Sequence, residues 1–141
     1  MEMQAPEKQL EFEVKNGIAW VTLLKNTITP EFSLEFHKTL DELEKMDEVR
    51  VVIFKSAHPR IFFAGADLKG ITDLSEANLP NVRKALWEAF RLTYHLEHFQ
   101  RPTIACVDGA SMGGGCEFAL ACDFILASEK ARFGFPEVKR G

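Results

Sequence analysis

Hydrophobic and polar residues alternate along the first part of the chain. Leu10, Phe12 and Val14 are separated by charged residues, a pattern typical of a strand with one buried face. Asn16 and Gly17 follow, and this pair favours the tight turn of a β-hairpin with residues 18–24 as the returning strand. Later apolar runs predict a strand buried on both faces at residues 51–54, another buried strand at 103–107, a further strand at 124–127 and a short one near 132–133.

Two longer segments have the three- or four-residue spacing of apolar positions that indicates an amphipathic helix. The first begins with Thr29 as N-cap, Pro30 in the first turn and Glu31 near the positive end of the helix dipole. Its apolar stripe comprises Phe32, Phe36, Leu40, Leu43 and Met46. The second helix, which ends at residues 101–102, has its stripe at Val82, Leu86, Ala89, Thr93 and Leu96.

A short apolar helix is predicted over residues 116–122. The alternation of strands and helices implies an α/β fold with right-handed crossover connections. We expect a single domain over residues 1–141, and the sequence has no visible internal repeat.

The composition excludes several classes of protein. The 141 residues are 46% hydrophobic and 27% charged, which argues against disordered, collagen-like and coiled-coil chains. A net charge of −4 without a basic run gives no reason to expect nucleic acid or an anionic membrane as a partner. The longest apolar run, residues 118–122, is far shorter than the ~20 residues that span a bilayer.

The N-terminus and the cysteines bear on the compartment. The N-terminus is acidic where a targeting peptide needs basic residues. Three cysteines without a C-x-x-C pair predict neither a disulfide framework nor a zinc site. We therefore expect a reduced, soluble, cytoplasmic protein.

Two loops rich in small residues follow buried strands. In residues 63–68, Gly65 allows a sharp bend and Ala66 offers its backbone N–H with little obstruction, although an ordinary strand-to-helix turn has the same pattern. In residues 113–115, three glycines open the short helix, where unpaired N–H groups and the helix dipole favour a negatively charged ligand atom. A tight packing corner is the alternative. The spacing does not fit the phosphate-binding loops of nucleotide-binding proteins.

Two carboxylates accompany these loops. Glu117 lies in a helix whose other residues are apolar all round, so we expect the helix to be buried. A carboxylate there is costly unless it caps the first turn or is used in chemistry. Glu137 follows Pro136, which rigidifies the turn, and alone it is typical of an exposed loop. Neither residue identifies a reaction by itself.

Taken together, these segments resemble the enoyl-CoA hydratase/isomerase (crotonase) family. The order and the spacing of the motifs both agree with the family pattern, from about Val14 to the last residue. The matching segments are residues 63–69, 101–105, 108–117, 121–123 and 131–137. Because the motifs agree together, the combination is far more specific than any one of them.

The resemblance implies a fold, a reaction and a substrate. The implied fold is the crotonase-like ββα spiral without its C-terminal helical region. The implied reaction is the addition of water across the 2,3 double bond of an enoyl-CoA thioester, a lyase activity of fatty acid metabolism. No cofactor is implied, because coenzyme A is part of the substrate.

The resemblance also implies site residues. The backbone N–H groups of Ala66 and Gly114 form the implied oxyanion hole, which stabilises the enolate. Glu117 is the implied base that activates the water, and Glu137 is the implied acid that protonates the α-carbon. The remaining residues implied in substrate binding are Ala64, Gly65, Asp67, Leu68, Lys69 and Gly113.

Two features depart from the family pattern. Residues 25–31 replace the usual segment that lies against the CoA nucleotide, where Lys25 and Lys69 are candidate phosphate contacts. Family chains also continue past this point into helices that complete the acyl pocket and the trimer contacts. We therefore expect the isolated chain to be weakly active or inactive and to associate through exposed apolar surface. The full-length protein is expected to be a homo-oligomer, a trimer or a hexamer of trimers.

Other functions stay open. Family members that only isomerise often keep one of the two glutamates, so the presence of both favours hydration. An inactive crotonase-like module is the non-enzymatic alternative. A serine hydrolase is a third, because residues 109–113 place Ser111 in the G-x-S-x-G pattern of a nucleophile elbow, although no histidine follows His98. His95 and His98 have a spacing that suits a metal, but no third ligand is evident nearby.

Overall fold

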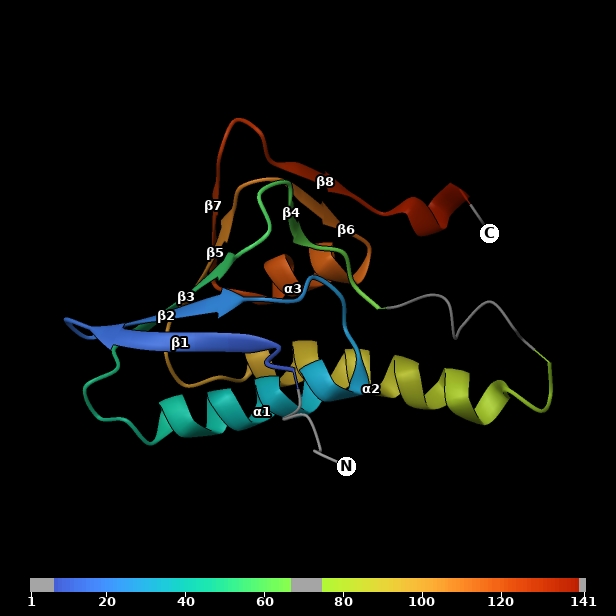
Figure 1. The fold of residues 1–141 in the computed structure, drawn as a ribbon, viewed down its shortest axis with the longest axis horizontal. Coiled ribbons are helices and arrows are strands. Elements are labelled where there is room, and N and C mark those ends of the chain that lie inside the picture. The colour runs from blue at the N-terminus through green and yellow to red at the C-terminus, as the bar shows by residue number, and fades with distance from the viewer. Residues whose placement is uncertain (1–6, 67–74, 140–141) are drawn as a thin grey trace, which may run out of the picture.

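The chain folds into two β-sheets and three α-helices over the residues that the computed structural model describes, 7–66 and 75–139 (Figure 1). The larger sheet has the strand order β1-β2-β3-β5-β7, and the smaller one has the order β4-β6-β8. Strands β1 and β2 are antiparallel, whereas the other neighbouring strands run parallel. In chain order the elements are β1 (Leu10–Lys15), β2 (Ile18–Leu23), α1 (Pro30–Glu44), β3 (Val51–Ser56), β4 (Ile61–Phe63), α2 (Leu79–Glu97), β5 (Thr103–Val107), β6 (Ala110–Met112), α3 (Gly114–Ala121), β7 (Phe124–Ala127), β8 (Arg132–Gly134) and a 3₁₀ helix at Pro136–Lys139.

From β3 onward the chain repeats a unit of two strands and a helix. Strands β3 and β4 with α2 form one unit, β5 and β6 with α3 form the next, and β7 and β8 begin a third. The first strands of these units are neighbours in the larger sheet, and the second strands are neighbours in the smaller sheet. The backbone therefore winds as a ββα spiral, which confirms the predicted α/β class. The repeat is structural and leaves no visible trace in the sequence.

The turn residues and the helix-capping residues of the N-terminal half adopt the predicted structures. Asn16 and Gly17 have φ angles of 54° and 79°, as the tight turn between β1 and β2 requires. At the start of α1, the hydroxyl of Thr29 accepts a hydrogen bond from the backbone N–H of Phe32 at 3.2 Å. Pro30 occupies the first helical position, where its missing N–H costs nothing.

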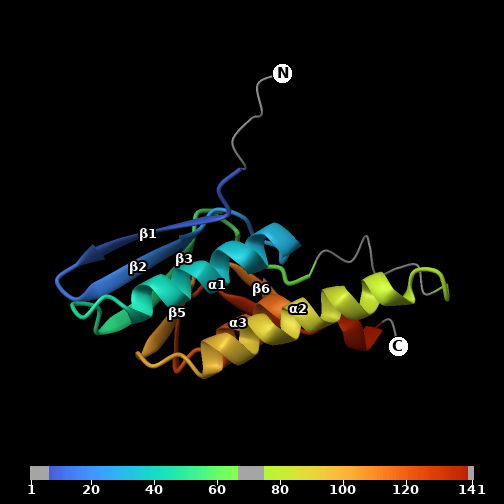
Figure 2. The same ribbon diagram turned by 90° about the horizontal axis from the view of Figure 1, so that it is seen from below.

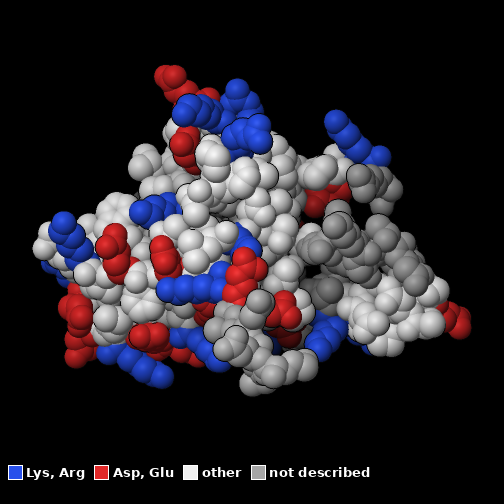
Figure 3. Space-filling model, in the orientation of Figure 1, with Lys and Arg blue, Asp and Glu red and all other residues white. Residues whose placement is uncertain are grey.

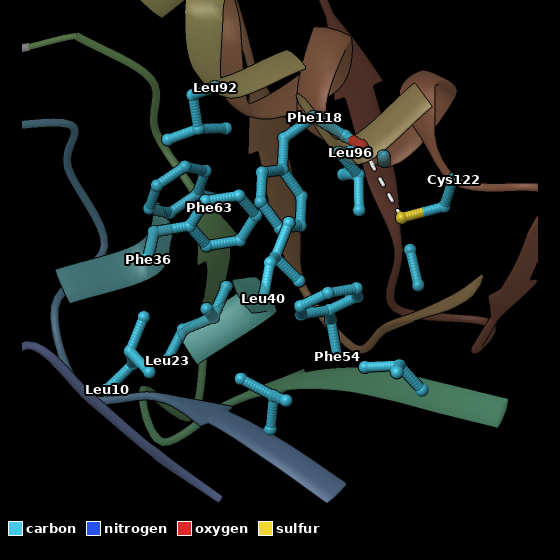
Figure 4. Packing of buried hydrophobic residues seen from close by; sticks show 14 of the residues in the cluster. Leu10, Leu23, Phe36, Leu40, Phe54, Phe63, Leu92, Leu96, Phe118 and Cys122 are labelled. Atoms are coloured by element: carbon cyan, nitrogen blue, oxygen red, sulfur yellow. Dashed lines mark hydrogen bonds between the residues drawn. The ribbon is translucent and has the colours of Figure 1, made fainter. Parts of the chain in front are cut away.

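A cluster of aromatic side chains joins α3 to both sheets (Figure 4). The ring of Phe118 in α3 lies 5.3 Å from that of Phe54 in the larger sheet and 5.2 Å from that of Phe63 in the smaller sheet. Phe36 of α1 lies 5.6 Å from the same ring. All four side chains are fully buried, and each contributes roughly 1.5–3 kcal/mol of hydrophobic stabilisation. The helix that begins at the glycine run is therefore fixed to both sheets.

Strands β2, β3 and β5 of the larger sheet are buried on one face, whereas all residues of β7 are exposed. Figure 2 shows α1 and α2 side by side over that face. In β3, Val52 and Phe54 are buried, whereas Val51 and Ile53 on the opposite face are only half-buried. The prediction that this strand is buried on both faces is therefore wrong for the described residues, and β5 shows the same alternation.

The predicted stripe of α2 is also partly wrong. Val82 and Leu96 are buried as predicted, but Leu86 is 56% exposed, and the predicted stripe omits Leu92, which is fully buried. This helix has a second apolar stripe, with Trp87, Phe90 and Tyr94 exposed. The helix ends at Glu97 rather than at residues 101–102.

Smaller differences concern the ends of elements and the surface. Met46 lies beyond the end of α1 and is half-buried. Strands β4 and β6 have three residues each, too few to show an alternating pattern. None of the described helices combines the length and the apolar character needed to cross a bilayer. On the face shown in Figure 3, acidic and basic side chains are interspersed.

Candidate active site

Two backbone segments touch where the smaller sheet meets α3. Gly65 has a φ of 83°, and a Cβ there would lie 2.6 Å from the amide nitrogen of Gly114. A Cβ on Gly114 would lie 3.1 Å from the Cα of Gly65 and 3.5 Å from the amide nitrogen of Ala66. The structure therefore brings the backbones of Ala66 and Gly114 together, and glycine at positions 65 and 114 makes this approach possible.

The amides of Ala66 and Gly114 have no backbone partner within the described ranges. No carbonyl of the described chain accepts a hydrogen bond from either N–H. Gly114 is the first residue of α3, and the first N–H groups of a helix have no acceptor within it. An N–H at this position, with the positive end of the helix dipole behind it, can bind an oxygen atom that carries negative charge.

Backbone hydrogen bonds hold both segments in place. The N–H of Ala64 donates to the carbonyl of Asn26 at 2.7 Å, and the N–H of Ile28 donates to the carbonyl of Gly65 at 2.8 Å. The N–H of Gly113 donates to the carbonyl of Gly134 at 2.8 Å. The sequence interpretation missed these supports because main-chain atoms provide them, and main-chain atoms leave no residue-type signal.

Helix α3 begins two residues before its predicted start. Gly113 precedes it with a φ of 53°, and its carbonyl accepts hydrogen bonds from the N–H groups of Cys116 and Glu117 at 2.8 and 3.1 Å. The helix buries one side only, because Leu120 is 62% exposed and Glu117, three residues earlier, is exposed as well. The prediction of a helix buried all round, with a buried Glu117, is therefore wrong for the described chain.

The two predicted glutamates approach the same helix end from different elements. A Cβ on Gly114 would lie 3.7 Å from Oε2 of Glu117. Glu137, in the 3₁₀ helix, places Oε1 where a Cβ of Gly113 would stand. Both carboxylates also influence Cys116: burial raises the pKa of its thiol, the hydrogen bond with Gly134 lowers it, and the charges of Glu117 and Glu137 raise it further. The structure thus gathers the two carboxylates at the N-terminus of α3.

The other predicted substrate-binding residues fall into two groups. Ala64 is exposed beside the Gly65–Gly114 contact, while Gly65 and Gly113 are buried in it. Asp67, Leu68 and Lys69 lie outside the described residues.

The structure contradicts the serine-hydrolase alternative. Ser111 lies in the middle of β6 rather than on a sharp strand-to-helix turn, and its side chain is fully buried. Its hydroxyl donates a hydrogen bond to the carbonyl of Gly115 at 2.9 Å. A nucleophile elbow requires an exposed hydroxyl.

The histidine pair of α2 does not form a metal site within the described ranges. His95 faces His37 of α1, with 2.7 Å between their Nδ1 atoms, and His98 stacks on Tyr94. No group of three potential ligands among the described residues could hold a metal ion.

The chain is similar in sequence to known proteins. The chain is 37% identical over 134 residues to the short-chain-enoyl-CoA hydratase of Clostridium acetobutylicum, covering 94% of this chain and 50% of that protein. It is 32% identical, with the same coverage, to the crotonyl-CoA hydratase of Syntrophomonas wolfei. The chain thus spans about half the length of these curated relatives.

Solved structures and the family profile give the same result. An enoyl-CoA hydratase from Bacillus anthracis superposes with a TM-score of 0.87 at 28% identity, over 95% of this chain and 53% of that one. An enoyl-CoA hydratase/isomerase from Xanthobacter autotrophicus gives a TM-score of 0.83 at 34% identity, over 94% and 50%. The crotonase-like fold expected from the sequence is therefore confirmed. The profile of the enoyl-CoA hydratase/isomerase family matches residues 13–141, and the chain belongs to that family.

Proposed function

We propose that the protein is part of an enoyl-CoA hydratase, with an acyl-CoA thioester as substrate and no separate cofactor. The observation that carries the proposal is the contact of the Gly65–Ala66 backbone with Gly114, which places next to each other two amides that no carbonyl of the described residues pairs with. Two relatives that align over 94% of the chain are named as hydratases of short-chain enoyl-CoA and crotonyl-CoA.

In this proposal the amides of Ala66 and Gly114 form an oxyanion hole. Both N–H groups donate to the thioester carbonyl oxygen, which becomes negative when water adds to the conjugated double bond. The stabilisation is larger for the enolate than for the neutral thioester, so it lowers the barrier rather than only tightening binding. Loss of one such donor typically costs about 3–4 kcal/mol. Ala64, Gly65 and Gly113 shape the backbone around this oxygen.

Glu117 and Glu137 are assigned to the water and the α-carbon. Glu117 takes a proton from the water while the oxygen of the water bonds to C3. Glu137 delivers a proton to C2 of the enolate. Each reacting proton is then transferred by one carboxyl group. The approach of both carboxylates to Gly113 and Gly114 favours hydration over the alternative of isomerisation, and over an inactive module.

Assembly and compartment belong to the proposal as well. Large apolar side chains are exposed on β7 and α3, at Phe124, Leu126 and Leu120, and such surface supports association into a homo-oligomer. The trimer as its unit is taken from the family resemblance. The three cysteines are free thiols, which suits a reducing compartment such as the cytoplasm.

The experiment follows hydration of a short 2-enoyl-CoA by the full-length protein through the loss of the enone absorbance. Glu117→Gln and Glu137→Gln keep the side-chain size but remove the proton-transferring group, so each should lower kcat by at least about a hundredfold. Glu13→Gln on β1 is the matched control at an exposed glutamate, and it should leave kcat unchanged. Unchanged turnover in both site variants would contradict the proposed function.

A further inference from the structure

Ser111 is a buried polar residue that the hydration mechanism does not use. Its side chain has no solvent exposure, and its hydroxyl donates to the carbonyl of Gly115 at 2.9 Å. Gly115 is the residue directly after Gly114, whose amide is one of the two proposed donors. Helix α3 has no side-chain cap at Gly113, and the Ser111 hydroxyl donates to a carbonyl of its first turn.

The same residue lies next to the other donor segment. Ser111 is paired with Phe63 across β6 and β4, and Phe63 directly precedes Ala64, Gly65 and Ala66. The Phe63 carbonyl in turn packs against Gly115 so closely that a Cβ on Gly115 would overlap it. The structure thus joins three residues, Ser111, Phe63 and Gly115. Ala66 lies three residues after Phe63, and Gly114 lies directly before Gly115.

We propose that Ser111 is a positioning residue whose hydroxyl holds the first turn of α3 against β4 and thereby sets the separation of the Ala66 and Gly114 amides. The proposal rests on the proposed function, since it concerns the same oxyanion hole. Without the hydroxyl, the Gly115 carbonyl loses a buried partner, and the first turn is free to shift relative to β4.

The first test is independent of turnover. The amide ¹H–¹⁵N signals of Ala66 and Gly114 are recorded by NMR for this chain and for Ser111→Ala. We expect both signals to shift and hydrogen exchange in the first turn of α3 to accelerate. The matched control is Thr103→Val on β5, because Thr103 is also buried and its hydroxyl bonds to Asp123 at 2.9 Å. This control should leave both amides unchanged. Shifts confined to β6, with the two amides unmoved, would overturn the proposal.

The second test separates this proposal from the proposed function. Hydration of a short 2-enoyl-CoA by Ser111→Ala should show kcat about tenfold lower, with KM within about twofold, since a 1 Å misplacement of reacting groups can cost about a hundredfold. An active wild type with an unchanged kcat in Ser111→Ala would refute the positioning role alone. Absence of hydration by the full-length wild-type protein, with the amide shifts present in Ser111→Ala, would refute the hydratase assignment and leave the positioning role standing.

Discussion

At the scale of single residues, the site depends on glycines that allow backbone to touch backbone. Gly115 is the tightest case, because a Cβ there would overlap the carbonyl oxygen of Phe63, which is main chain in a strand and cannot rotate away. Gly134 offers a comparison nearby, where a Cβ would lie 3.1 Å from the sulfur of Met112, the mobile end of a flexible side chain. The cost of an added methyl group should therefore differ between the two positions.

Gly115→Ala should lower the free energy of unfolding by about 3 kcal/mol, the upper part of the usual range for overpacking. Gly134→Ala should cost less than about 1 kcal/mol, because the Met112 side chain can rotate. Chemical denaturation of both variants measures the two values. Equal destabilisation would show that the contact between α3 and β4 is looser than the structure indicates.

At the scale of elements, two histidines join α1 to α2. The Nδ1 atoms of His37 and His95 are 2.7 Å apart, so one nitrogen must donate a hydrogen and the other must accept it. His95 also lies near Asp41, with 3.6 Å between Nε2 and Oδ1, which favours the His95 tautomer that carries its hydrogen on Nε2. His37 then donates from Nδ1, and its buried Nε2 has no hydrogen-bond partner among the described residues. Two protonated rings would place N–H against N–H.

The pH dependence of stability should report this pair. Burial lowers the pKa of His37 below 6.5, the charges of His95 and Arg91 add to the effect, and Glu88 and Asp41 oppose it. Below pH 6.5, His37 binds a proton more readily in the unfolded chain than in the folded chain. The free energy of unfolding therefore falls as the pH falls through the lowered pKa of His37. Above about pH 7, His37 is neutral in both the folded and the unfolded chain, so its contribution to the free energy of unfolding is fully present.

Denaturation curves between pH 5 and 8 check this expectation. His37→Phe keeps a ring but cannot bind a proton, so its stability should decline less steeply below pH 6.5 than that of the wild type. His98→Phe, on the exposed end of α2, is the control for loss of a histidine and should follow the wild type. Parallel curves for wild type and His37→Phe would contradict the expectation.

The elements also show what sequence reasoning can reach. The hairpin at Asn16-Gly17 and the cap at Thr29 were predictable because each depends on the residue type at one position. The packed face of α2 was predictable from Val82 and Leu96, but the exposure of Leu86 and the burial of Leu92 were not, because contacts with α1 and α3 decide them. The short strands β4 and β6 are defined by pairing with distant residues rather than by their own pattern.

The candidate site likewise has features that the sequence predicts and features that only the structure shows. Its glutamates and glycines were identifiable from motif spacing, since side-chain chemistry and the lack of a Cβ are written in the sequence. The supports from Asn26, Ile28 and Gly134 are main-chain carbonyls and amides, so only the structure reveals them. The nucleophile alternative for Ser111 needed the structure to be excluded, because the pattern around the residue does not say whether its hydroxyl is exposed.

At the scale of the whole molecule, the site lies at a junction of both sheets and a helix. The larger sheet, the smaller sheet and α3 meet at the ring of Phe118. The candidate donor amides of Ala66 and Gly114 belong to the backbone segments that follow Phe63 and begin α3. The described surface also exposes several large apolar side chains on β7 and α2, including Phe124 and Trp87. Association of the isolated chain through such surface, and weak activity in isolation, stay predictions.

The most direct test of the account measures the thioester carbonyl itself. Isotope-edited Raman spectra of a short enoyl-CoA, labelled with ¹³C at C1, give the carbonyl stretching frequency free in solution and bound to the protein. Two converging N–H donors should lower that frequency on binding. Replacement of the Gly114 amide by an ester, which removes the N–H without adding an atom, should reverse much of the shift. A bound carbonyl whose frequency equals that in solution, or one indifferent to the ester, would contradict the account.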